Sequence, residues 1–118
     1  MKKLQRGEVW LVDLGLGLAA KIRPCLVLSV PLEDADRSLV TLIPHTTSLR
    51  GSRFEAIVPV KFLRSGGFDV QGIVTIPTVR LIRHLGTLSP TQLQIVEASV
   101  CIWLGLSPNI SQEVNARH

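Results

Sequence analysis

The chain has few aromatic residues: it contains no Tyr, three Phe and two Trp among 118 residues. So few rings argue against an extended aromatic surface of the kind on which single-stranded nucleic acids stack their bases. Cysteine is also rare. Cys25 and Cys101 both lie in apolar segments and lack the C-x-x-C spacing of metal and redox sites. This pattern is typical of buried thiols in a reducing compartment, and we therefore expect a cytoplasmic protein.

Long hydrophobic runs are absent as well. The apolar stretch 93–106 is too short for a membrane span and is interrupted by Gln94 and Glu97. Near the N-terminus, Arg6 and Glu8 interrupt what could otherwise be the apolar region of an export signal. We expect no association with a membrane.

The size and charge of the chain are those of one small, basic globular domain. Hydrophobic residues make up 46% of the sequence and the formal net charge is +4, a balance that permits a nucleic-acid partner without requiring one. A chain of this length buries enough surface to fold without disulfides or metal ions. We expect a single domain over residues 1–118, with its core at about 6–106 and a polar tail at 107–118.

The first three quarters of the chain predict short β-strands. Apolar and β-branched runs are separated by Gly, Pro, Asp and Ser, and no long helical period intervenes. Strands spaced at about 10–15 residues are typical of a small barrel or a curled sheet. The expected strands are Glu8–Leu14, Pro24–Val30, Leu39–Ile43, Phe54–Val60, Gly72–Ile76 and Val79–Ile82.

A helix is predicted at the C-terminal end of the domain. Ser89 and Gln92 match a capping box with Pro90 in the first turn, and Gly105 is a typical helix stop. Apolar residues cover about half of the predicted cylinder, more than one core requires. The excess indicates either contact with a second subunit or deeper burial within the same domain.

Arg23-Pro24 is the most informative pair of residues in the chain. It opens the apolar run Cys25–Val30, and proline restrains the preceding residue to extended backbone. Arg23 is therefore expected to project from the strand entrance in a narrow range of directions. A guanidinium held in this way suits a phosphate group. Lys21, at the end of a Gly-containing loop, places a second cation beside it.

The segment 44–53 gathers hydroxyl, imidazole and guanidinium groups after the third expected strand. Hydroxyl donors and arginines are the groups that contact a phosphate backbone. The alternative is a polar turn whose Thr and Ser side chains only bond their own backbone. The candidate residues are His45, Thr46, Thr47, Ser48, Arg50 and Arg53.

Taken in order, these segments resemble the PemK/MazF toxins, which act as ribonucleases. The family opens with an RGEVWLVDL-like strand, matched by residues 6–14, and continues with an RP motif before an apolar strand, matched by 23–29. Its Pro-x-Thr turn is matched by Pro44-His45-Thr46. Residues 80–88 and the helix resemble its closing section, so the likeness covers about residues 6–106.

The resemblance implies a mostly β fold, an SH3-like or CcdB-like small barrel with a C-terminal α-helix, and a homodimer. It further implies a toxin of a type II toxin–antitoxin system, a sequence-specific endoribonuclease that cleaves single-stranded RNA without a metal or other cofactor. Its partner would be an antitoxin of the MazE/PemI kind, acidic and partly disordered, folding on the toxin. By its RP and Pro-x-Thr motifs, the resemblance implies that Arg23 and Thr46 are the catalytic pair. Thr47 is the alternative to Thr46 if the register of the turn shifts by one residue.

The chemistry of such cleavage suits these residues. When a 2′-hydroxyl attacks the neighbouring phosphorus, negative charge grows on the non-bridging oxygens, and a fixed arginine with a hydroxyl donor stabilises it. Arginine is a poor base because its pKa lies above 12, so the general base is left open. His45, Thr47 and Ser48 are candidates for a catalytic or RNA-binding role. No spacing of ligands predicts a metal site.

Two further predictions concern RNA contacts and an alternative function. Lys21, Arg50, Arg53 and Arg80 are expected to bind RNA, although the family's Asp-Gln-x-Arg-Thr-like segment is altered here at residues 75–80. The alternative is a non-catalytic toxin resembling CcdB, which binds and poisons DNA gyrase. The broad apolar face of the predicted helix motivates this second hypothesis.

Overall fold

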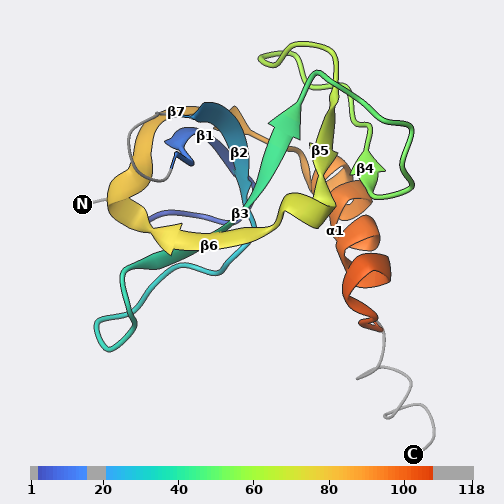
Figure 1. Ribbon diagram of the computed structural model, residues 1–118. Helices are drawn as coiled ribbons and strands as arrows, with labels where there is room; N and C mark the ends of the chain where they lie inside the picture. Colours follow the sequence, from blue (N-terminus) through green and yellow to red (C-terminus); the bar gives the residue numbers. More distant parts are fainter. Residues whose placement is uncertain (1–2, 16–20, 108–118) are drawn as a thin grey trace, which may run out of the picture.

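The computed structural model describes residues 3–15 and 21–107, which fold into a curled antiparallel sheet with one helix against it (Figure 1). Two short 3-10 turns, η1 (Val70–Gly72) and η2 (Thr78–Arg80), interrupt the strands. The elements are β1 (Glu8–Asp13), β2 (Ile22–Val27), β3 (Leu39–Thr46), β4 (Glu55–Ala56), β5 (Gly67–Asp69), β6 (Val74–Pro77), β7 (Leu81–Thr87) and α1 (Pro90–Leu104).

Strand β3 is the centre of the sheet. The strands follow the order β4-β5-β3-β2-β1-β7, and β6 pairs with β3 outside this path. The first part of β3 pairs with β6 and β2, whereas its last residues, His45 and Thr46, pair with Phe68 and Gly67 of β5. Among the described strands β4 and β7 remain the two ends of an open path. The expected mostly β fold with a C-terminal helix is confirmed, but its sheet is open rather than a closed barrel.

Alternation along the strands divides the apolar side chains between two cores. In β1, Val9 packs into the core that α1 covers, while Val12 packs into a second core on the other face of the sheet. Phe68, which is fully buried, is the largest side chain of the first core. Each face of the sheet is therefore anchored by burial, which fixes the register of the strands.

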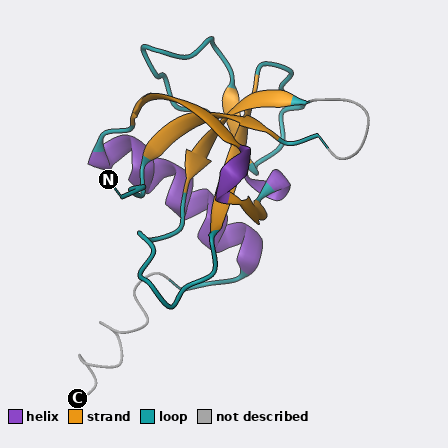
Figure 2. Ribbon diagram, turned by 90° about the vertical axis from the view of Figure 1, so that its left-hand side faces the viewer, coloured by secondary structure: helices purple, strands orange, loops and turns teal. Residues whose placement is uncertain are grey.

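The helix α1 begins and ends as its sequence predicts. The Ser89 side chain accepts the backbone N–H of Gln92, and the Gln92 side chain accepts the N–H of Ser89. Gly105 closes the helix in the left-handed conformation, at φ 68°, which glycine adopts without steric cost. Val96 and Val100 are buried against the sheet, and Figure 2 shows α1 lying along one side of the strands.

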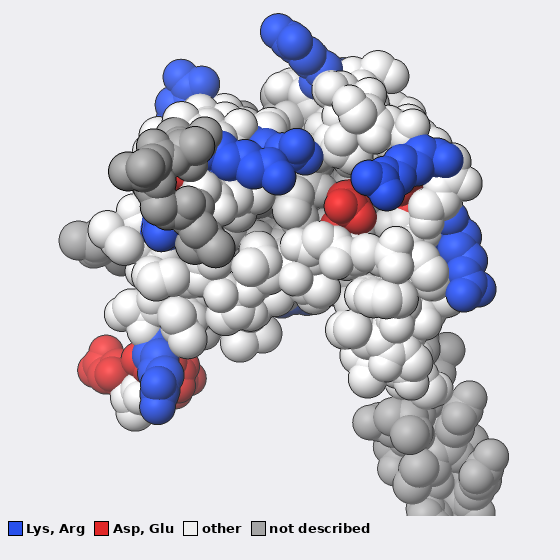
Figure 3. All heavy atoms as spheres, viewed as in Figure 1, with Lys and Arg blue, Asp and Glu red and all other residues white. Residues whose placement is uncertain are grey.

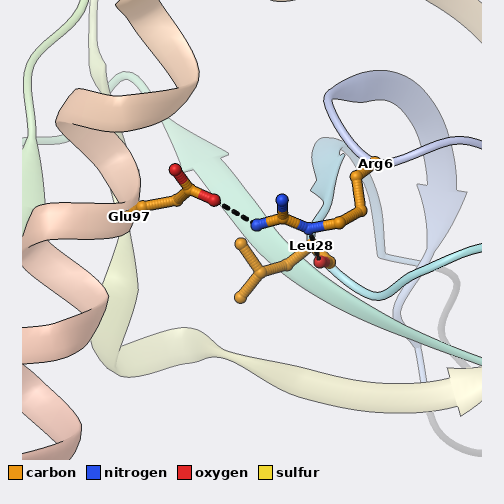
Figure 4. A network of polar contacts seen from close by, with 3 residues as sticks. All are labelled: Arg6, Leu28 and Glu97. Atoms are coloured by element: carbon orange, nitrogen blue, oxygen red, sulfur yellow. Dashed lines mark hydrogen bonds and ion pairs between the residues drawn. The ribbon is translucent and has the colours of Figure 1, made fainter. Parts of the chain in front are cut away.

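A polar clamp joins the N-terminal segment to the helix (Figure 4). The Arg6 guanidinium forms an ion pair with Glu97 of α1, and its Nε donates to the carbonyl oxygen of Leu28 at 2.6 Å. One side chain thus contacts both the residue after β2 and the middle of the helix. Arg6 therefore ties together three segments that are distant in the sequence.

Several local predictions need correction. The expected strand Phe54–Val60 is a strand only at Glu55–Ala56, because Pro59 cannot donate to a ladder. Sequence reasoning missed β5, which is only three residues long and begins at Gly67, directly after Gly66. The last expected strand begins later, after η2, and runs on to Thr87. Residues 108–118 of the expected tail lie outside the described residues.

Two further observations concern the burial of the cysteines and the question of a membrane span. Cys25 is fully buried, and burial raises the pKa of its thiol to about 12, whereas Cys101 is partly buried. Within the described part of the chain, no helix has the length and apolarity that a membrane span requires.

Candidate functional site

The site is formed where β2 and β3 separate. The two strands pair from Val27 with Leu42 as far as Cys25 with Pro44. Neither Pro24 nor Pro44 has an N–H group to donate, so the ladder ends here and β3 turns to β5. The antiparallel register, if continued by two residues, sets Arg23 opposite Thr46. Both side chains therefore stand at the mouth of the gap between the diverging strands.

Arg23 lies on the partly buried rim of this gap. It lines two neighbouring grooves, and Thr46 and Ser48 line the same two. Among the described residues the one ion pair joins Arg6 to Glu97, so no described carboxylate forms an ion pair with the Arg23 guanidinium. A cation left free beside hydroxyl groups is available to an anionic ligand.

Thr46 has a hydroxyl whose orientation is constrained by its own turn. Its Oγ1 accepts the backbone N–H of Ser48 at 3.0 Å. The hydroxyl proton remains available, so the group can donate to a ligand while the turn holds it in place. The two readings of segment 44–53, phosphate contact and a self-bonded turn, are therefore compatible at Thr46.

Groove 1 is the larger of the two, with a volume of about 690 Å³. Its walls carry three arginines, Arg23, Arg64 and Arg83, and no carboxylate. Arg83 on β7 pairs with Leu11, which pairs with Pro24 on its other side, so this row of residues crosses three strands. Groove 1 is consequently a positively charged surface built largely on the sheet.

Groove 2, of about 460 Å³, has a mixed charge. Lys21, Arg23 and Arg50 share its walls with the carboxylates of Glu55 and Asp69. The two carboxylates offset much of the positive charge of this groove, which is not the case in groove 1.

Glu55 has a structural task in groove 2. Its oxygens accept the backbone N–H groups of Arg50 and Ser52 at 2.9–3.0 Å. The hydrogen bond from the Arg50 backbone is the main reason that the pKa of Glu55 lies below its usual value. The carboxylate therefore stays ionised and fixes the turn that carries Arg50.

Asp13 and Arg80 hold the base of the loop that leads to Arg23. The carboxylate of Asp13 accepts the N–H of Gly15 at 2.9 Å and that of Lys21 at 3.2 Å. These bonds, the one from Gly15 first, lower the pKa of Asp13. The Nη1 of Arg80 donates to the carbonyl oxygen of Gly15 at 2.6 Å. Lys21 is thereby kept beside Arg23, although residues 16–20 of the expected loop lie outside the described residues.

The predicted RNA-binding residues do not all gather at the grooves. Thr47 lines groove 1, and Lys21 and Arg50 line groove 2. Arg80 is engaged with backbone at the loop base, and the Arg53 guanidinium lies 4.5 Å from the centre of the Phe54 ring, beside α1. Neither of these two arginines lines either groove.

His45 lies on the buried side of the site. Its ring meets Phe68 edge to face, with the centroids 5.1 Å apart, and it contributes to the wall of groove 1. Burial lowers the pKa of His45 below the usual 6.5, so its imidazole is neutral at neutral pH. A neutral imidazole can accept a proton.

Three groove residues were missed by sequence reasoning: Phe62, Arg64 and Arg83. Phe62 and Arg64 lie in the segment between β4 and β5, which has no regular structure and no motif. Arg83 follows an apolar pair, and only its pairing with Leu11 reveals that it faces groove 1. Within residues 3–15 and 21–107, no three His, Cys, Asp or Glu side chains are grouped as a metal ion would require.

One face of the molecule is unevenly charged. Figure 3 shows several Lys and Arg side chains over the upper half of one face, with acidic side chains in smaller, separate groups. The fold and the site together define a small β protein with one basic groove, a class suited to binding a flexible polyanion.

Comparison with known proteins identifies the family. Residues 5–104 match the family model described as PemK-like, MazF-like toxin of type II toxin–antitoxin system. Because this match spans most of the sequence, the chain belongs to that toxin family.

Solved structures have the same fold. An endoribonuclease from a mycobacterial species, in complex with its cognate antitoxin, is 23% identical with a TM-score of 0.74, covering 88% of this chain and 97% of its own. MazF from Deinococcus radiodurans is 20% identical with a TM-score of 0.74, covering 90% and 100%. The Mycobacterium tuberculosis toxin MazF-mt6 is 25% identical with a TM-score of 0.68, covering 85% and 98%.

Proposed function

We propose that this toxin is an endoribonuclease that cleaves single-stranded RNA at the mouth of the gap between β2 and β3. The observation that carries the proposal is the convergence of Arg23, Thr46 and Ser48 on the rim shared by the two grooves. The family match and the fold, which it shares with structures named as endoribonucleases, support it.

In the proposed reaction, the 2′-hydroxyl of one nucleotide attacks the adjacent phosphorus. The 5′-oxygen of the next nucleotide leaves, and a 2′,3′-cyclic phosphate remains. Arg23 and the Thr46 hydroxyl donate to the non-bridging oxygens as their negative charge grows. One well-placed donor of this kind lowers the barrier by about 3–4 kcal/mol. No metal ion is needed for this step.

The remaining site residues have supporting roles in this proposal. Thr47 and Ser48 supply further hydroxyl donors, while Lys21 and Arg50, on the walls of groove 2, add positive charge near Arg23 that attracts the RNA chain to the site. His45 is neutral at neutral pH and stands as a candidate proton acceptor or RNA contact. Arg53 and Arg80 remain predicted RNA contacts that would act outside the two grooves.

The proposed partner is an antitoxin that is acidic and partly disordered when free. Such a segment would cover the basic groove and order itself on binding. One structure of the same fold is that of an endoribonuclease with its cognate antitoxin. We further propose that the toxin is a homodimer and acts in the cytoplasm, where its RNA substrate is found.

The alternative of a CcdB-like gyrase poison is less well supported. The family model that matches is that of the PemK-like, MazF-like toxins. The Arg23 site also offers a guanidinium and hydroxyl donors, the groups that bind a phosphodiester. The apolar residues of α1 that first motivated this alternative include Ile95 and Ile102, which are exposed. Exposure alone does not specify gyrase.

The test is cleavage of single-stranded RNA by Arg23→Ala and Thr46→Val. Arg37→Ala, in the hairpin 31–38 and outside both grooves, is the matched control. We expect the Arg23 variant to lose about 100-fold or more in cleavage rate while its unfolding transition stays close to that of the unaltered protein. Metal chelation should not change the rate. Full cleavage by Arg23→Ala would refute the proposal.

A further inference from the structure

We propose that groove 1 is a flanking RNA subsite, in which Arg64 and Arg83 bind phosphates next to the scissile one and Phe62 stacks a base. This inference rests on the proposed function, because Arg23 at the edge of the same groove marks the scissile phosphate. It assigns the path of the RNA chain to one of the two grooves.

The charge of the walls favours groove 1 over groove 2 for the phosphates. Groove 1 carries three arginines and no carboxylate. In groove 2, phosphates would lie close to Glu55 and Asp69. Because the pKa of Glu55 is lowered by its bonds to backbone N–H groups, its carboxylate stays charged and repels a phosphate. Successive phosphates of one strand therefore find better surroundings in groove 1.

The strand register fixes where Arg83 lies relative to the scissile site. Arg83 pairs with Leu11 and Leu11 with Pro24, so Arg83 stands two strands away from the β2 residue next to Arg23. Adjacent strands are about 4.8 Å apart, which sets the backbones of Arg83 and Pro24 about 10 Å apart. Given the reach of an arginine side chain, this spacing suits a phosphate one or two nucleotides away from the one at Arg23.

Phe62 adds an aromatic surface that the low aromatic content did not predict. Its side chain is 40% exposed and lines groove 1. The ring lies against β7 at Gly86, where an added Cβ would come within 2.5–2.7 Å of three ring atoms. The absence of a side chain at Gly86 therefore lets the Phe62 ring pack directly against the strand. A base stacked on an exposed ring of this kind gains affinity without a requirement for sequence.

The first experiment measures binding without cleavage. The probe is a fluorescent, 2′-O-methylated RNA of randomised sequence, in which the attacking hydroxyl is blocked. The variants are Arg64→Gln, Arg83→Gln and Phe62→Leu, with Arg37→Gln as the matched control outside the grooves. We expect about tenfold weaker binding for each groove variant. The slope of log K against log salt should fall by about 0.7 for each lost arginine but not for Phe62→Leu.

Gly86→Ala provides a second test of the role of the Phe62 ring. It displaces the Phe62 ring without removing it, so it should weaken binding in the same direction as Phe62→Leu. Unchanged binding by Gly86→Ala and Phe62→Leu together would remove the stacking role. Groove variants that bind like Arg37→Gln would overturn the subsite as a whole.

Cleavage of substrates of different length separates the subsite from the chemistry. For an octanucleotide, Arg64→Gln and Arg83→Gln should raise KM with kcat unchanged, and for a dinucleotide, whose one phosphate is the scissile one, they should change neither. A loss of kcat equal to that of Arg23→Ala would place these arginines at the scissile phosphate and refute a flanking role. If the unaltered protein binds the methylated RNA through groove 1 but cleaves no RNA, the proposed nuclease fails and the subsite stands.

The same variants test the competing occupant. If an acidic peptide binds groove 1 and loses affinity in the Arg64, Arg83 and Phe62 variants while RNA binding does not change, the groove belongs to a protein partner. That result would overturn the RNA assignment.

Discussion

The close approach of Gly66 to the end of β3 makes a quantitative prediction for Gly66→Ala. A Cβ at Gly66 would overlap the carbonyl oxygen of Thr46 and lie 3.0 Å from both the Thr46 carbonyl carbon and the His45 Cε1. The main obstacle is backbone, and it cannot rotate away as a flexible side chain would. Pairing of Thr46 with Gly67 and packing of His45 on Phe68 hold the neighbouring segments together.

Relief of the overlap requires the end of β3 and the Gly66 loop to separate by about 1 Å, and overpacking of this kind costs about 1–3 kcal/mol of stability. The same displacement moves Thr46 relative to Arg23. A shift of about 1 Å in a positioned group can reduce a reaction rate about 100-fold. We therefore expect Gly66→Ala to impair cleavage far more than its loss of stability would explain.

The assay combines urea unfolding with cleavage of a fluorogenic single-stranded RNA, at a temperature where both proteins are folded. Ser65→Ala is the matched control, since it changes the preceding residue of the same loop. Gly66→Ala with stability within about 0.5 kcal/mol of the unaltered protein and with undiminished cleavage would refute the packing argument.

Three further predictions concern stability. Arg6→Met should lower the free energy of unfolding by about 1 kcal/mol in urea titrations. The loss is small because Arg6 and Glu97 are each about one-third exposed, so that water screens the ion pair. A double-mutant cycle with Glu97→Gln isolates the interaction. Gly105→Ala should cost about 1 kcal/mol in the same assay, since φ is 68° at this helix end. Burial lowers the pKa of His45, so the unfolded state takes up its proton first as pH falls below 6.5. Stability should then decrease toward acid pH by at most about 1.4 kcal/mol per unit, and His45→Gln should flatten this dependence.

The sequence was sufficient to predict the elements with the strongest local signals. The capping box at Ser89 and the stop at Gly105 define α1 almost to the residue, because caps act through neighbouring backbone groups. Strand β1 was predicted to within one residue at its end. Strand β5 was missed since its pairing with β3 and β4 is wholly non-local and its three residues contain no alternation to read.

The candidate site was predictable only where a motif marks it. Arg23 and Thr46 carry the family's signature, and both line the shared rim of the two grooves. Arg80 was interpreted as an RNA contact from its place in the altered family segment at residues 75–80, and in the structure its guanidinium donates to the Gly15 carbonyl oxygen. The sequence does not show whether the donors of an arginine will bond to a backbone carbonyl oxygen or to a ligand, because the bonding partner can be a residue distant in the chain.

The position of the site follows from how β3 divides its hydrogen bonds. Its first residues are held between β2 and β6, but Pro44 has no N–H with which to continue toward β2, and the chain turns to β5. Where β2 and β3 separate, they leave a gap, and the side chains at its rim are not covered by either neighbouring strand. Arg23 precedes one proline and Thr46 follows the other by two residues, so the same prolines that end the ladder place these groups at its open end. A motif of two short pieces, far apart in sequence, thereby specifies both the gap and the functional groups on its rim.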